Sequence, residues 1–174
     1  MDRPSLARAI HDAAHLTGHF VLRSGATSNT YFDKYLFESD PVLLRAIAEH
    51  MAPLVPEGTE ALAGLELGGV PLAVALGQVT GLPVLFVRKE AKAYGTAKLA
   101  EGGEIEGRRI TVVEDVVTSG GQVITSCGDL RERGADILGV VCVIDRQAGG
   151  PENMAAHDLA LTPLFGMDEL LGRS

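Results

Sequence analysis

The chain has 174 residues, of which 46% are apolar, and it carries a formal net charge of −8 with an isoelectric point near 5.1. This length and apolar content suffice to bury one sizeable core, so we predict a single domain over residues 1–174. The acidic balance argues against a nucleic-acid-binding surface, which needs a basic face to contact phosphates.

Cysteine usage and hydropathy indicate where the protein works. Cys127 and Cys142 lie in apolar company without the CxxC spacing of a metal site, so we expect two buried free thiols. No stretch is long and apolar enough to span a bilayer, and Asp2, Arg3 and Pro4 stand where a signal peptide would carry its apolar region. We therefore expect a cytoplasmic protein that does not bind membranes.

Helices alternate with short apolar strands along the chain, a pattern typical of a parallel sheet covered by helices. Ser5 can cap a first helix, which we expect to end at Gly18. His11, His15 and His19 share an interval of four, but the helix end intervenes and no HExxH pattern follows, which favours a solvated face over a metal site. The later expected elements are helices over residues 41–52, 72–78 and 121–134, strands over 61–65, 83–87, 110–113, 137–144 and 159–164, and a helical turn over 168–171.

The stretch over residues 109–122, Arg-Ile-Thr-Val-Val-Glu-Asp-Val-Val-Thr-Ser-Gly-Gly-Gln, organises the rest of the chain. We expect its buried strand to stop at Glu114 and Asp115, which could accept hydrogen bonds from vicinal hydroxyls or hold Mg²⁺. Residues 118–121 then open a helix with free backbone N–H groups, two hydroxyls and the positive end of a helix dipole. This combination suits one phosphate group.

A plainer interpretation of the same stretch is a strand-to-helix turn, in which Thr118 or Ser119 is the N-cap and both acids are solvated. We favour a sugar-phosphate site because the acids lie between two Val-Val pairs, where an unpaired charge would be costly to bury. The residues resemble the phosphoribosyl pyrophosphate (PRPP) signature of type I phosphoribosyltransferases, which reads as apolar residues, two acids, two apolar residues, and Thr-Ser/Ala-Gly.

Three further segments resemble the orotate phosphoribosyltransferase family. Residues 20–28, Phe-Val-Leu-Arg-Ser-Gly-Ala-Thr-Ser, are similar to the family segment that covers the pyrimidine, although by themselves they favour a plain hairpin slightly. Residues 88–92, Arg-Lys-Glu-Ala-Lys, are similar to the mobile catalytic loop, although a solvated loop is about as compatible with the run alone. Asp-Arg-Gln at residues 145–147 is similar to the segment that binds the orotate carboxylate, with an ion pair between Arg146 and Asp145 as the alternative.

The resemblance implies a type I phosphoribosyltransferase fold: an α/β fold whose central, mostly parallel sheet is flanked by helices. It implies a small N-terminal hood over about residues 18–37 and a mobile catalytic loop over about residues 88–108. The implied reaction transfers the phosphoribosyl group of PRPP to orotate, giving orotidine 5′-monophosphate and pyrophosphate in pyrimidine biosynthesis. The implied cofactor is Mg²⁺, bound mainly through PRPP with Asp115 as the candidate protein ligand, and the implied assembly is a homodimer with shared active sites.

The resemblance also implies roles for individual residues. The catalytic residues would be Lys92, Arg88 and Lys89. The PRPP-binding residues would be Arg88, Lys89, Lys92, Glu114, Asp115, Val116, Val117, Thr118, Ser119, Gly120, Gly121 and Gln122. The orotate-binding residues would be Thr118, Arg146, Arg23, Tyr31 and Phe32.

The chain departs from the family pattern at several positions. Arg23 stands where many members have lysine, and Tyr31 where many have phenylalanine, but a cation and aromatic faces are kept. Tyr94 stands where many have histidine, so we assign it no acid role. The loop over residues 66–71 lacks a lysine near Gly68, so its backbone N–H groups would have to bind pyrophosphate alone.

Two other functions fit parts of the pattern. One is a phosphoribosyltransferase for another base, or a ligand-sensing regulator of the same fold, which would have little need of Lys92. The other is a different nucleotide-binding α/β protein, but neither G-x-G-x-x-G nor G-x-x-x-x-G-K-[ST] occurs.

Overall fold

The computed structural model describes residues 1–21, 25–90 and 99–172, which are built around one six-stranded sheet. Its strands are β3 (Ala61–Leu65), β4 (Val84–Val87), β5 (Ala100–Glu101), β6 (Arg109–Val117), β7 (Asp136–Asp145) and β8 (Leu161–Gly166). They lie in the order β5-β4-β3-β6-β7-β8, and every neighbouring pair is parallel except β5 with β4. The predicted α/β fold with a mostly parallel sheet is confirmed.

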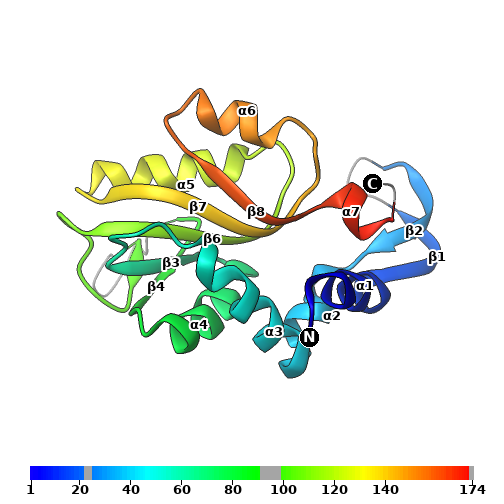
Figure 1. Cartoon of the computed structure of the whole chain (residues 1–174). Coiled ribbons are helices and arrows are strands. Elements are labelled where there is room, and N and C mark those ends of the chain that lie inside the picture. The colour runs from blue at the N-terminus through cyan, green and yellow to red at the C-terminus, as the bar shows by residue number, and fades with distance from the viewer. Residues whose placement is uncertain (22–24, 91–98, 173–174) are drawn as a thin grey trace.

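Helices cover both faces of the sheet, so that the molecule has three layers (Figure 1). One face carries α3 (Pro41–Met51), the 3-10 turn η1 (Ala52–Leu54) and α4 (Gly69–Thr80), and the other carries α5 (Gly121–Glu132) and α6 (Gly150–Ala155). The helices α1 (Arg3–Ala14) and α2 (Lys34–Ser39) pack against α3, and α7 (Met167–Leu170) follows β8.

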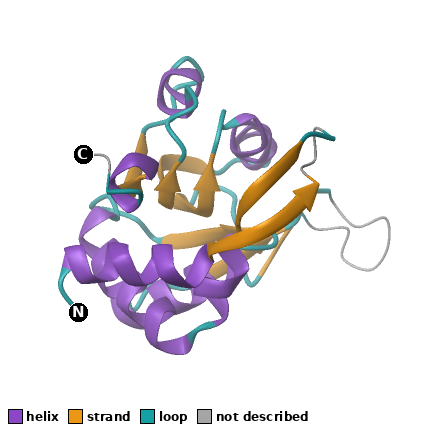
Figure 2. Cartoon of the chain, turned by 90° about the vertical axis from the view of Figure 1, so that its right-hand side faces the viewer, coloured by secondary structure: helices purple, strands orange, loops and turns teal. Residues whose placement is uncertain are grey.

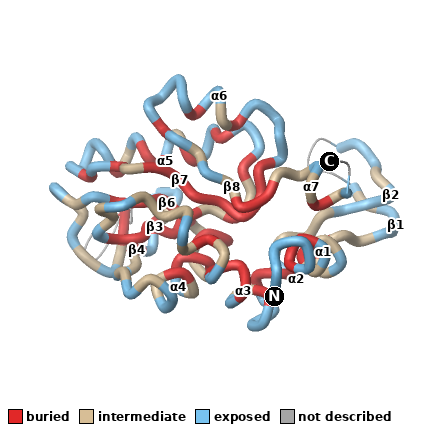
Figure 3. The backbone as a smooth tube through the Cα atoms, in the orientation of Figure 1, coloured by how far each residue is buried: buried red, intermediate tan, exposed pale blue. Residues whose placement is uncertain are grey.

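Two apolar clusters fill the space between these layers. The cluster under α3 and α4 includes Ile47, Leu72 and Val113, and the cluster under α5 includes Val112 and Cys127. All five positions of β3 are buried, and Figure 3 shows the same for most of β7. Strands buried on both faces have unbroken apolar sequences, which is why the sequence revealed them without any alternation.

The hood is a separate ribbon made of β1 (His15–Val21) and β2 (Thr27–Phe32), which pair antiparallel. Figure 2 shows this ribbon in front of the sheet, on the side where β8 leads into α7. The expected helix end at Gly18 is wrong, because α1 ends at Ala14 and His15 already pairs with Phe32. Cross-strand pairing over these residues outweighs one further helical turn.

The histidine face does not form a metal site within the described residues. The rings of His11 and His15 stack with their centroids 4.8 Å apart, while His19 lies in β1. The part of the chain that the structure describes holds no group of three or more His, Cys, Asp or Glu side chains that could bind a metal ion.

The prediction that the central strand stops at the two acids is wrong. β6 continues through Glu114 and Asp115 to Val117, because β7 extends beside it and pairs Glu114 with Cys142 and Val117 with Asp145. A charged pair within a strand interrupts the apolar pattern but not the ladder of backbone hydrogen bonds.

Several elements differ from their predicted extents. The helix α4 begins at Gly69 rather than at residue 72, and the two-residue strand β5 lies inside the predicted catalytic loop. The short helices α2 and α6 were not predicted. No helix in the described residues is long and apolar enough to cross a membrane.

Candidate active site

The loop after β6 has the geometry of an anion site. Thr118 and Ser119 are exposed at the end of the strand, and α5 begins at Gly121. Gly120 is the N-cap and has φ of +77°, a left-handed conformation that favours glycine. Since Gly120 occupies the cap position, neither hydroxyl residue is the N-cap of this helix, contrary to the plainer interpretation of the sequence.

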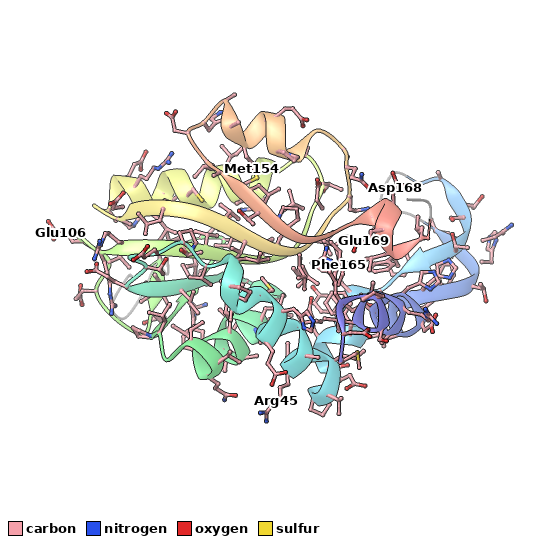
Figure 4. The ribbon with its side chains drawn as sticks, in the orientation of Figure 1. Arg45, Glu106, Met154, Phe165, Asp168 and Glu169 are labelled. Carbon is pink, nitrogen blue, oxygen red and sulfur yellow. The ribbon has the colours of Figure 1, made fainter. Side chains whose placement is uncertain are left out.

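Helix α6 supports this loop from behind. The side-chain amide of Asn153 donates a hydrogen bond of 2.8 Å to the carbonyl oxygen of Ser119. A Cβ atom on Gly120 would lie 2.7 Å from Cγ of Met154, and one on Gly150 would lie 2.6 Å from the carbonyl oxygen of Thr118. Figure 4 labels Met154, which lies between α6 and the layer below it. The helix therefore fixes the loop through close contacts that only glycines permit.

The sequence contained a signal for this helix. Gly149 with φ of +80° is followed by Pro151 in the first turn, and proline at that position is typical of a helix start. The segment is only six residues long, and without a long apolar stripe it gave no sign that it packs against residues 118–121.

A cavity of about 320 Å³ opens in front of this loop. It is lined by Lys34, Tyr35, Glu66, Leu67, Lys89, Glu114, Asp115, Val116, Val117, Thr118, Ser119, Gly120, Gly121, Gln122 and Val123. Every described residue of the predicted PRPP set lines it except Arg88, which lines a neighbouring cavity of about 160 Å³ with Leu67 and Phe86. Lys92 lies outside the described residues, as do Arg23 and Tyr94.

The two acids have different surroundings. Asp115 is buried, and its Oδ1 accepts a hydrogen bond from the N–H of Val116 while its Oδ2 lies 2.5 Å from Nζ of Lys34. Glu114 is half-buried, and its Oε1 accepts a hydrogen bond of 3.0 Å from the N–H of Asp115. Burial and the neighbouring Asp115 carboxylate raise the pKa of Glu114 to about 9. At neutral pH Glu114 therefore keeps its proton in the ligand-free protein, while the carboxylate of Asp115 is paired with Lys34.

A third acid, which the sequence analysis missed, stands behind this pair. Glu38 on α2 is 6% exposed, and its Oε1 has no hydrogen-bond partner among the described residues. Burial and the adjacent Asp115 raise the pKa of Glu38 to about 8. Burial lowers the pKa of Lys34, but its hydrogen bond and charge interaction with Asp115 outweigh this effect and raise it. Only the N-cap residue Asp33, which accepts from the N–H of Tyr35, marked this helix in the sequence.

Of the described residues predicted to bind the base, Thr118 lines the cavity, whereas Tyr31, Phe32 and Arg146 do not. Tyr31 is 44% exposed and its ring centroid lies 5.5 Å from that of Phe20, whereas Phe32 packs beside the buried Phe37 at 6.5 Å. Successive strand residues point to opposite faces, so the two rings of the predicted pair are separated here.

Arg146 is exposed at the carboxyl end of β7, and its N–H donates to the carbonyl oxygen of Val117, 2.8 Å away. The alternative ion pair with Asp145 is not found among the ion pairs of the described residues. Asp145 Oδ1 instead accepts the N–H of Gln147 at 2.9 Å. The backbone of Arg146 is therefore anchored next to Thr118.

Comparisons with known proteins agree with this geometry. The family model of the phosphoribosyl transferase domain matches residues 40–159. An orotate phosphoribosyltransferase of Nocardioides sp. is 50% identical over 166 residues, which cover 95% of this chain and 93% of the relative, and one of Methanocella arvoryzae is 43% identical over 155 residues, 89% of each. The crystal structure of the Mycobacterium tuberculosis H37Rv orotate phosphoribosyltransferase in complex with PRPP superposes with a TM-score of 0.84 at 28% identity, over 98% of this chain and 99% of that one.

The chain belongs to the orotate phosphoribosyltransferase family.

In this orotate phosphoribosyltransferase family member, the acidic cluster explains why position 68 is a glycine. Gly68 is buried at the start of α4, where any Cβ atom would overlap Oδ2 of Asp115 and lie 2.8 Å from Oε1 of Glu38. The adjacent Glu66 accepts the N–H of Lys89 at 2.6 Å, which joins this loop to the start of the predicted catalytic loop. No side chain longer than hydrogen fits at Gly68 while the acidic cluster keeps this arrangement.

Proposed function

We propose that the chain transfers the phosphoribosyl group of PRPP to orotate and releases pyrophosphate, with Mg²⁺ as its cofactor. The observation that carries the proposal is the cavity in which a phosphate-type loop, residues 118–121, meets two carboxylates at the end of one buried strand. The loop would hold the 5′-phosphate at a helix N-terminus, and Glu114 with Asp115 would accept hydrogen bonds from the ribose hydroxyls.

The reaction requires cations around the leaving group. Cleavage at the ribose C1 leaves positive charge on the sugar and moves negative charge onto the departing pyrophosphate. Lys89 lines the cavity, and Arg88 precedes it with a buried Nε that has no partner among the described residues. Together with Lys92 these side chains would stabilise the pyrophosphate as it leaves, and closure of their loop would exclude water that could hydrolyse the donor.

The pyrimidine would lie between the hood and the end of β7. The Arg146 guanidinium suits a bidentate contact with the orotate carboxylate, and Thr118 lies beside it because the Arg146 backbone is bonded to Val117. Tyr31 offers an exposed aromatic face for stacking. Phe32 would have to leave its contact with Phe37 to join it, and Arg23 would supply a further cation.

Magnesium fits this site mainly as a partner of the substrate. The described residues contain no cluster able to hold a metal ion alone, and both carboxylate oxygens of Asp115 are already engaged by Lys34 and Val116. Asp115 would therefore have to exchange Lys34 for the ion, whereas PRPP brings the oxygen ligands that Mg²⁺ prefers. When bound, Mg²⁺ supplies charge neutralisation for the pyrophosphate.

We also propose a cytoplasmic homodimer. Leu67 and Phe86 expose 67% and 39% of their surface beside Arg88, an apolar patch that a second subunit could cover. Cys127 and Cys142 are both buried and free, as predicted, which is consistent with a reducing compartment.

A spectrophotometric assay tests the function directly. Purified protein with PRPP and Mg²⁺ should consume orotate, measured as the loss of its ultraviolet absorbance, and should leave uracil unchanged. Reactions without PRPP are the control. Orotate that stays unchanged when all components are present would contradict the proposal, and turnover of uracil instead would reassign the base.

A further inference from the structure

Four ionisable side chains from two elements meet at the base of the PRPP cavity. Lys34 and Glu38 come from α2, and Glu114 and Asp115 come from β6. Nζ of Lys34 lies 2.5 Å from Oδ2 of Asp115, and the Lys34 side chain is 33% exposed whereas that of Asp115 is 1% exposed. Among the described residues this ammonium is the one cation paired with the three carboxyl groups.

The local sequence explains how these groups reach one point. Asp33 caps α2 by accepting the N–H of Tyr35 at 3.1 Å, which starts the helix at Lys34. Lys34 and Glu38 are four residues apart, so both side chains lie on the same face of the helix. Gly68 faces them without a side chain and leaves room for Oδ2 of Asp115 and Oε1 of Glu38.

The charges in this cluster do not balance without Lys34. Burying a carboxylate without a partner costs far more free energy than leaving it exposed to water. Removal of the ammonium would therefore leave the buried Asp115 carboxylate without its cation, and that carboxylate would rotate, take up water or bind a proton. Any of these changes would alter the acceptor that Asp115 presents to a ligand.

We propose that Lys34 is a positioning residue for the donor: its ammonium holds the buried Asp115 carboxylate in the orientation that accepts the ribose hydroxyls. The inference rests on the proposed contact between the acid pair and the ribose. Lys34 acts through Asp115, and the phosphates are bound by residues 118–121 and the cations of the catalytic loop. The helix α2 thereby becomes part of the ribose site, although the sequence analysis assigned none of its residues to the site.

The experiment compares ligands with and without ribose hydroxyls. Orotidine 5′-monophosphate, its 2′,3′-dideoxy analogue and inorganic pyrophosphate are titrated calorimetrically into the wild type, Lys34→Met and Lys34→Arg. Methionine keeps the length of the side chain without its charge, and arginine keeps the charge. Circular dichroism of each variant verifies the fold, and the ratio of the two nucleotide affinities within one variant does not depend on how much protein is active.

In the wild type, the hydroxyls should strengthen nucleotide binding by about 10-fold or more, as expected for hydrogen bonds to a charged acceptor. In Lys34→Met this preference should fall to about 2-fold, with pyrophosphate affinity nearly unchanged, and Lys34→Arg should keep most of it.

Each contrary outcome has a separate meaning. If the wild type binds both nucleotides equally, the acid pair does not contact the ribose hydroxyls, and the inference about Lys34 is refuted with it. A full hydroxyl preference in Lys34→Met would leave the ribose contact intact and refute the role of Lys34. A loss of pyrophosphate affinity in Lys34→Met as large as the loss of the hydroxyl preference would show that Lys34 binds phosphate directly and would refute its positioning role.

Discussion

Glu38 makes the stability of the ligand-free protein depend on pH. Its pKa is raised from 4.5 to about 8 in the folded chain, first by burial and then by Asp115, so between these values the folded protein retains a proton that the unfolded chain has released. Because the folded state binds more protons there, the free energy of unfolding falls as the pH rises from about 5 to 8. We predict that Glu38→Gln removes this part of the decline, on the order of 2 kcal/mol, after allowance for its coupling to the other acids.

Urea unfolding at several pH values measures the effect. Glu60→Gln is the matched control, since backbone and side-chain hydrogen bonds from Arg109 lower the pKa of Glu60, and its contribution is lost only as the pH falls below its ordinary value. That variant should keep the slope of the wild type between pH 5 and 8. An unchanged slope in Glu38→Gln would show that Glu38 is ionised in the folded protein.

At the scale of residues, the sequence revealed the site residues that form a contiguous motif. It missed the residues that contact this motif from a distant part of the chain. Glu114 and Asp115 were predicted as ligand-binding acids, and the argument that a charge between valines must be paired holds, since Asp115 is buried and paired. The pairing residue, Lys34, could not be identified, because it is 81 positions away from Asp115 by their residue numbers and its role depends on how α2 packs against β6. Glu38 was missed for the same reason.

At the scale of elements, the contact between α6 and the loop over residues 118–121 can be tested by adding one methyl group. We predict that Gly120→Ala weakens PRPP binding by about 10-fold or more, because the new Cβ would meet Met154 at 2.7 Å and the residue has φ of +77°. Gly128→Ala is the control, since Gly128 lies within α5 with open space around its Cβ position and alanine favours a helix. Calorimetric PRPP affinity should separate the two variants, and equal affinities would show that α6 does not constrain the loop.

Element boundaries show which forces a one-dimensional pattern omits. The buried strands β3, β6 and β7 were predicted from unbroken apolar runs, and each was found. The end of α1 and the continuation of β6 were predicted wrongly, because in both places pairing with a distant strand decides the backbone conformation. The helices α2 and α6 are six residues each, too short for a clear periodicity.

The whole molecule should respond to its donor by mass action. A ligand at 100 times its dissociation constant stabilises the folded state by about 2.7 kcal/mol, which for a chain of this size corresponds to a rise in Tm of about 5 to 10 °C. We predict that PRPP with Mg²⁺ gives such a rise, and that a chelator reduces it by at least half because the ion would be bound largely through the donor. Mg²⁺ alone should change Tm by less than about 1 °C, as the described residues form no metal cluster. A full rise in the presence of chelator would remove Mg²⁺ from donor binding.

The assembly can be tested by mixing two inactive variants. If the loop that carries Lys92 enters the site of the neighbouring subunit, Lys92→Ala damages the partner's site while Arg146→Ala damages its own. In the mixed dimer both defects then fall in one site and the other site is intact. Random exchange makes half of the dimers mixed, so the mixture should recover about a quarter of the wild-type activity in the orotate assay. Self-contained subunits would instead leave one defect in every site, and the mixture would stay as inactive as either variant alone.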